Sequence, residues 1–112
     1  DEYCGGNSID AIAWYDGNSG GKTHWVAGKQ SNRWGLHDMS GNVWEWVEDC
    51  WNTSTNDAPS DGSAWTKDKC GHVVRGGSWT NGPQGVRTAI RSSGGIAQGF
   101  NGNGFRLART LP

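Results

Sequence analysis

Long apolar runs are missing from this sequence, and hydrophobic residues make up only 33% of it. Since a helix that crosses a membrane needs about 20 consecutive apolar residues, we expect no membrane insertion. The first residues also lack the basic-then-apolar order of a secretory signal peptide. The chain begins with Asp-Glu-Tyr-Cys, in the middle of a pattern, and we interpret it as an excised or processed piece.

Cysteine motifs for metals are also missing. The three cysteines are Cys4, Cys50 and Cys70, with no CxxC pair and no histidine at zinc-finger spacing, so we expect no metal cluster of that kind. Cys50 and Cys70 bracket a loop and are the candidate disulfide, which leaves Cys4 free or paired outside the chain. A disulfide favours an oxidising compartment, so we expect an extracellular or cell-surface protein.

Acidic residues are absent from the last third of the chain. Residues 1–70 hold all 11 acids and five bases, while residues 71–112 hold five arginines, so the two parts carry charges of −6 and +5. Such asymmetry arises in nucleic-acid-binding proteins and also where two halves attract each other in one fold. The arginines are scattered singly, without a lysine cluster, so we favour the second interpretation and expect no nucleic-acid partner.

Glycine and tryptophan are abundant instead, with 19 and 8 residues among 112. A chain of this length forms at most one small domain. The indole rings carry much of the apolar mass, and we expect a core of aromatic anchors without aliphatic layers.

Helical periodicity is nearly absent, because Gly, Asn, Ser and Asp interrupt every window before two turns are complete. Short aromatic or β-branched runs closed by turn residues predict strands, at Asp10–Tyr15, Thr23–Ala27, Asn42–Val47, His72–Arg75 and Gly104–Leu107. Two long turn-rich segments, Asn52–Lys69 and Thr80–Asn103, are expected to be loops. In the run from Val43 to Val47, alternation places Glu45 beside two valines, where its charge needs a cation or several donors.

Three blocks in series carry a family resemblance. GNVWEW at Gly41–Trp46, RGGSW at Arg75–Trp79 and GFR at Gly104–Arg106 resemble the formylglycine-generating enzyme family in order and spacing. The resemblance implies an α+β, C-type-lectin-like fold, mostly irregular with short antiparallel strands. It also implies that residues 1–112 are the C-terminal part of a single domain, with the N-terminal remainder of the fold as a partner.

The family's enzymes bind copper through two cysteines that follow the GGS block, and the matching positions here are Asn81 and Val86. Neither side chain supplies a thiolate, so we expect no copper and no catalysis. The alternatives are a formylglycine-type oxidase that takes a cysteine from Cys4 or from the N-terminal part, and a pseudo-enzyme regulator or structural domain.

The family also binds calcium at the GNVWE block, which implies a structural Ca²⁺ held by Asp38, Gly41, Val43 and Glu45 through hard oxygen ligands. The alternative is that Glu45 meets Arg75 or another arginine as a buried pair. For the arginines in general, Arg75, Arg87, Arg91 and Arg106, we expect a role in bracing loops in preference to an anion-binding cluster.

Residues 80–103 resemble the variable region of retroelement-diversified proteins that share this fold. Adenine randomisation of Asn codons cannot give Lys, Glu, Met or Trp, and the segment contains none of them; Gln84 and Gln98 alone fall outside the reachable set. A Gly/Ser-rich loop of ordinary drift would have a similar composition. Either way we expect a protein or glycan ligand at this loop, bound by Trp79, Thr80, Asn81, Gly82, Gln84, Val86, Thr88, Ile90, Ser92, Ser93, Ile96, Phe100, Asn101 and Asn103.

Overall fold

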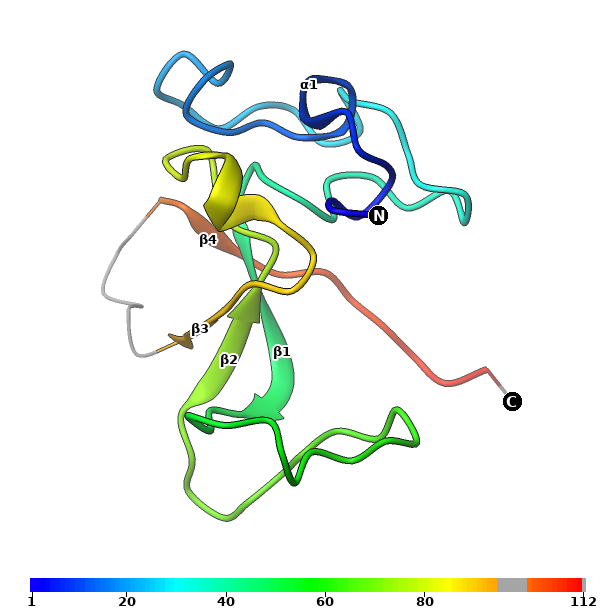
Figure 1. Ribbon diagram of the computed structural model, residues 1–112, viewed down its shortest axis with the longest axis vertical. Coiled ribbons are helices and arrows are strands. Elements are labelled where there is room, and N and C mark those ends of the chain that lie inside the picture. Colours follow the sequence, from blue (N-terminus) through cyan, green and yellow to red (C-terminus); the bar gives the residue numbers. More distant parts are fainter. Residues whose placement is uncertain (95–100, 112) are drawn as a thin grey trace.

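The computed structural model describes residues 1–94 and 101–111. In these residues, regular structure is limited to four short strands and two single-turn helices, and loops make up the rest (Figure 1). The elements are α1 (Ile9–Ile12), β1 (Trp44–Cys50), β2 (His72–Arg75), the 3-10 helix η1 (Pro83–Val86), β3 (Arg91–Ser93) and β4 (Asn103–Gly104). The expected α+β fold, mostly irregular with short strands, is confirmed.

The strands form one sheet in the order β3-β2-β1-β4. β1 pairs with β2, and β2 with β3, in antiparallel directions, whereas β1 and β4 run parallel. The expected antiparallel pairing therefore holds for two of the three pairs. Between Trp46 and Cys50 the pairing register with β2 shifts, through a bulge or another irregularity, before β1 reaches the long loop of residues 51–70.

Three strand predictions are corrected. Residues 9–12 form the single turn α1 inside the predicted strand Asp10–Tyr15, because Ile9 and Ile12, three positions apart, both face the core cluster. Thr23–Ala27 is irregular, and Gly104–Leu107 is strand only at Gly104. These short runs carry β-forming residues, but backbone partners decide whether a run becomes a strand.

The other predicted segments agree better with the structure. His72–Arg75 is β2, and Asn42–Val47 corresponds to β1, which begins two residues later and continues to Cys50. Residues 52–69 contain no helix or strand, as expected. The predicted loop Thr80–Asn103 contains η1, β3 and the start of β4.

The buried core is small and mostly not aromatic, which contradicts the expectation of Trp anchors. Trp44 is the one buried indole among the eight, whereas Trp25 is 92% exposed and Trp34 is 68% exposed. The buried apolar residues are Tyr3, Ile12, Ala13, Trp44, Cys50, Val73, Val74 and Val86. A sheet of four short strands offers too little area to enclose several rings of this size.

Asn42 ties the N-terminal third to the sheet. Its backbone N–H donates to Trp14 O at 2.7 Å, and its carbonyl accepts from Trp79 N at 2.9 Å. Its side chain accepts from His24 N at 2.9 Å and donates to His24 O at 3.2 Å. Because the residue is buried, at 5% exposed, these bonds replace secondary structure as the frame in this part.

Opposite charges join the two parts of the sequence, as the charge asymmetry predicted. Within the described residues, both ion pairs link an acid of residues 1–70 to an arginine of residues 71–112: Glu2 with Arg87, and Glu45 with Arg106. Over the same residues, no helix has the length and apolar character that crossing a membrane requires.

Candidate functional site

The described part of the segment predicted to bind a ligand, residues 79–94 and 101–103, includes η1 and β3, and β3 is one of the two edge strands of the sheet (Figure 1). Four of its predicted contact residues are exposed, namely Thr80, Gln84, Thr88 and Asn101. Seven are half-buried, namely Trp79, Asn81, Gly82, Ile90, Ser92, Ser93 and Asn103. Ile96 and Phe100 lie outside the described residues.

Val86 does not belong to this surface, and its prediction as a ligand contact is corrected. Its side chain is 0% exposed and packs with Tyr3, Ile12 and Ala13 in the core. Val86 is the last residue of η1 and its side chain is buried, whereas Gln84 in the same turn is exposed. The apolar character that favoured ligand contact is what holds the turn against the core.

Asn81 braces the turn that enters η1. Its Oδ1 accepts from Ser78 N at 2.8 Å and from Ser78 Oγ at 2.9 Å, and Ser78 is fully buried. Its carbonyl accepts from Asp16 N at 3.0 Å. The side-chain amide and the backbone carbonyl of Asn81 thus both hold the backbone in place, as asparagine residues often do in turns.

The two ends of the segment are anchored near the start of β1, at Asn42 and Trp44. At one end Trp79 N donates to Asn42 O, and Trp79 Nε1 donates to Asn101 O at 3.5 Å. At the other end Asn103 pairs with Trp44. The described residues between these two ends are therefore held by backbone hydrogen bonds to the start of the sheet.

Three of the four residues predicted to bind calcium line one hollow: Asp38, Val43 and Glu45. Asp38 Oδ1 is buried without a hydrogen-bond partner, and its Oδ2 accepts from Ala27 N at 2.8 Å. Gly41 donates its N–H to Gly76 O at 2.8 Å. The orphaned Asp38 oxygen is the feature of this set that fits a cation.

Glu45, however, already has a partner in this hollow. Its two carboxylate oxygens accept from Nε and Nη2 of Arg106, each at 2.5 Å, and Arg106 also donates to His37 O at 2.9 Å. The hydrogen bond to Glu45 is the main reason that the pKa of Arg106 is raised. The alternative that Glu45 pairs with an arginine is thus the arrangement present, with Arg106 as the arginine, but the pair is partly exposed and not buried.

With both Glu45 oxygens bound to a guanidinium, the predicted ligand set does not fit Ca²⁺ in this arrangement. The described part of the chain also has no group of three or more His, Cys, Asp or Glu side chains placed to hold a metal ion. Calcium binding stays a prediction, and it requires Glu45 to leave Arg106.

The predicted disulfide between Cys50 and Cys70 is confirmed, and it closes a separation of 20 residues. Cys4 is free and half-buried, with Asn32 Nδ2 at 3.9 Å from its sulfur. Cys4 lines a second hollow together with Thr88, so it is the free thiol that lies beside the predicted binding segment.

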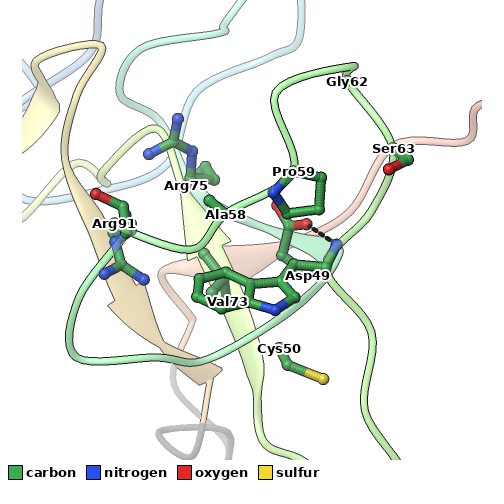
Figure 2. Close-up of a pocket in the computed structure, with 11 residues that line it drawn as sticks. Asp49, Cys50, Ala58, Pro59, Gly62, Ser63, Val73, Arg75 and Arg91 are labelled. Atoms are coloured by element: carbon green, nitrogen blue, oxygen red, sulfur yellow. Dashed lines mark hydrogen bonds between the residues drawn. The ribbon is translucent and has the colours of Figure 1, made fainter.

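Sequence reasoning missed a hollow of about 300 Å³ beneath the loop of residues 51–70 (Figure 2). Arg75 of β2 and Arg91 of β3 line it together with Asp49, Val73 and Trp65. Arg75 does brace a loop, as expected, by donating from Nη1 to Ile90 O at 3.2 Å. Arg91 instead stacks on the Trp51 ring, with 4.7 Å from its Cζ to the ring centroid.

Comparison with known proteins decides the family. The model of the sulfatase-modifying factor enzyme 1-like domain matches residues 1–111. The chain belongs to this family. The resemblance to formylglycine-generating enzymes stated from the GNVWEW, RGGSW and GFR blocks is thereby confirmed.

Solved structures agree with this sulfatase-modifying factor family fold. PvdO from Pseudomonas aeruginosa is 39% identical, with a TM-score of 0.78, over 89% of this chain and 40% of that chain. Treponema denticola variable protein 1 is 34% identical, with a TM-score of 0.65, over 83% and 35%. CarF is 29% identical, with a TM-score of 0.70, over 99% and 37%.

Among curated proteins, the chaperone protein LppX of Paenibacillus barcinonensis is 30% identical over 70% of this chain and 31% of its own length. The chain thus spans about a third of that relative and 35–40% of the solved structures.

Asn81 and Val86 are the residues that the resemblance matched to the family's two copper-binding cysteines, and in the structure both side chains make other contacts. Asn81 holds Ser78, and Val86 fills the core. Neither the Asn81 amide nor the Val86 side chain offers the soft sulfur ligand that copper chemistry needs.

Proposed function

We propose that this chain is a non-catalytic ligand-binding module whose specificity lies in residues 79–103. The observation that carries the proposal is the division within this segment. One end is bonded through Trp79 to Asn42, two residues before β1, and the other end pairs through Asn103 with Trp44 of β1. Between them, Thr80, Gln84 and Thr88 are exposed. Binding residues are commonly placed on loops that a rigid scaffold positions.

The ligand is a protein or a glycan presented outside the cell. Exposed hydroxyl and amide groups offer adaptable hydrogen bonds to such surfaces, and the Cys50–Cys70 disulfide fits an oxidising, extracellular or cell-surface location. Similarity to the Treponema variable protein supports a segment that differs between copies of the gene. Sequencing the gene across a population tests this last point, and uniform residues 80–103 would contradict it.

The binding test compares two triple variants of the chain. Thr80→Ala/Gln84→Ala/Thr88→Ala removes three exposed polar side chains from the segment, and Thr53→Ala/Ser60→Ala/Thr66→Ala removes three from the loop of residues 51–70. Labelled protein is applied to a glycan array and to intact cells. We expect at least about a tenfold loss of binding for the first variant and none for the second. Equal binding by the first variant and the parent chain would refute the proposal.

The competing function is a formylglycine-type oxidase that uses Cys4. Cys4 shares a hollow with Thr88, close in sequence to the family's catalytic positions. Incubation with copper and a cysteine-containing peptide, followed by mass spectrometry for the aldehyde, tests this function. Aldehyde formation that disappears in Cys4→Ser would replace the binding proposal by the enzymatic one.

A further proposal concerns the remainder of the fold. Trp25 and Leu107 are 92% and 91% exposed, and Phe105 is 75% exposed, which is unusual for such large apolar side chains. PvdO and CarF are longer than this chain, and we propose that the additional part of such a protein covers these three side chains. Acrylamide quenching of tryptophan fluorescence is expected to fall when this chain is expressed within a full-length family protein, and unchanged quenching would contradict the proposal.

A further inference from the structure

Arg75 and Arg91 face each other across the antiparallel pair of β2 and β3. Residues directly opposite in such a pair project from the same face, with Cβ atoms about 5 Å apart, and like charges there are destabilising. A sequence under no other requirement gains stability by replacing one of the two. Arg75 donates to Ala89 O and Ile90 O, and Arg91 stacks on the Trp51 ring. These contacts hold the two side chains but leave their charges unpaired.

In the described residues, neither Arg75 nor Arg91 forms an ion pair with a carboxylate, although Asp49 lines the same hollow. Glu45 lies opposite Arg75 on β1, but its oxygens are bound by Arg106. Arg75 and Arg91 take part in neither of the two ion pairs. Residues 95–100 are Gly-Ile-Ala-Gln-Gly-Phe and hold no acid. The two guanidinium groups are thus free to attract an anion.

Arg75 and Arg91 both line the hollow beneath the loop of residues 51–70 (Figure 2). In that view Arg75 and Arg91 lie on one side, and Pro59 and Ser63 of the loop lie on the other. The hollow, of about 300 Å³, is at the small end of ligand pockets. Because the disulfide ties the two ends of the loop together, the walls are held without a ligand.

The two arginines are also oriented before any ligand arrives. Arg75 Nη1 is fixed by Ile90 O at 3.2 Å and Ala89 O at 3.4 Å, which leaves its other donors available. Arg91 is supported by the Trp51 ring, a stacking that guanidinium groups favour. Guanidinium donors held in this way bind planar carboxylates with little loss of side-chain entropy.

Asp49 restricts the ligand further. Its Oδ1 accepts from Trp65 N at 2.8 Å, which leaves Oδ2 as an acceptor in the same hollow, near the hydroxyl-bearing Thr55 and Ser63. A ligand with several negative charges is repelled by Asp49, whereas a ligand with one carboxylate and several hydroxyl donors satisfies the whole lining. The half-buried ring of Trp65 adds an apolar wall for a sugar ring.

We propose that this hollow binds a carboxylate-bearing sugar unit, a uronate, with the carboxylate between Arg75 and Arg91 and a hydroxyl donating to Asp49. The inference extends the proposed binding function by a second site with a stated ligand class. The proposed binding function and the proposed uronate site can be tested separately. The Thr80/Gln84/Thr88 variant changes no residue that lines the hollow.

The test is a calorimetric titration of the chain with three probes: glucuronate, glucose and glutarate. Glucose has the ring without the carboxylate, and glutarate has carboxylates without the ring. We expect saturable binding of glucuronate and at least about tenfold weaker binding of the other two. Absence of saturable glucuronate binding, or equal binding of either other probe, overturns the proposal.

Arg91→Gln is the matching variant, and Arg87→Gln is its control, because Arg87 pairs with Glu2 outside the hollow. We expect Arg91→Gln to weaken glucuronate binding about tenfold or more and Arg87→Gln to leave it unchanged. Arg91→Lys, which keeps the charge but loses the planar fork, serves if Arg91→Gln does not fold, and a clear loss is expected for it too. Binding that survives in whichever variant folds overturns the proposal.

Discussion

The turn of residues 76–81 and the loop of residues 51–70 are both rich in Gly, Ser, Asn and Asp or Thr, yet they are held in opposite ways. In the turn, Ser78 is fully buried and Asn81 satisfies both its N–H and its hydroxyl. In the loop most residues are exposed, and the disulfide provides a covalent closure. Similar composition thus gives a turn held by buried hydrogen bonds at residues 76–81 and an exposed loop closed by a disulfide at residues 51–70.

Local bonds shape the loop where packing does not. Asp61 Oδ1 accepts from Ser63 Oγ at 2.6 Å and from Ser63 N at 2.9 Å, and these bonds lower the pKa of Asp61. A lowered pKa means that this contribution is present above the ordinary aspartate pKa and is lost as the pH falls through the folded value. Since the carboxyl is fully exposed, we expect only a local effect on the loop.

The largest expected effect on the free energy of unfolding is at Gly77, in the turn. Gly62, in the loop, has a similar φ angle and serves as the comparison. Gly77 has φ +72°, and a Cβ there would lie 2.4 Å from Gly85 O and 2.7 Å from Val86 Cγ1, whereas Gly62 has φ +85° and open space. Gly77→Ala therefore adds a steric clash to the backbone strain and should cost about 3–5 kcal/mol. Gly62→Ala should cost about 1–2 kcal/mol. Urea unfolding measures both, and equal losses would contradict the distinction.

Removal of the disulfide tests the loop in a second way. Cys50→Ala/Cys70→Ala should lower the free energy of unfolding by about 3 kcal/mol, because the covalent closure of 20 residues restricts the unfolded chain. Cys4→Ala, the matched control, breaks no covalent bond and should change stability much less. A double variant as stable as the parent would mean that contacts, and not the covalent bond, hold the loop.

Asn81→Ala is expected to have a smaller effect, confined to the turn. It leaves the buried N–H of Ser78 without an acceptor and removes one of the two partners of the Ser78 hydroxyl, the other being Thr80 Oγ1, at a cost of about 1–3 kcal/mol. Asn56→Ala in the loop removes an exposed amide and should cost less than about 0.5 kcal/mol. Thermal unfolding of the two variants gives the comparison, and an Asn81→Ala protein as stable as Asn56→Ala would show that Asn81 does not frame the turn.

Calcium is expected to have the smallest effect, because the Glu45–Arg106 bond must break before Glu45 binds a cation. The prediction is a slightly higher unfolding temperature in excess calcium than in excess chelator, and Asp38→Asn should abolish the difference. Identical unfolding temperatures of the parent chain in the two conditions would end the calcium hypothesis.

Much of the frame could be predicted from short patterns. The β-branched run at His72–Arg75 gave β2, and the blocks around Asn42 and Ser78 gave the family and the fold. The strand prediction at Asp10–Tyr15 was wrong because one helical turn buries Ile12 equally well. Arg91 was expected to brace a loop, and its position opposite Arg75 depends on a register that no single segment encodes.

The sequence by itself determined the family, the mostly irregular small-strand architecture and the closure of residues 51–69, because local propensity, motif order and two suitably placed cysteines suffice for these. Tertiary structure decided that Glu45 pairs with Arg106, that Val86 is core and that Arg75 and Arg91 share a hollow. These depend on which distant segments meet, and in a chain with so little regular structure the meeting is fixed by buried hydrogen bonds such as those of Asn42.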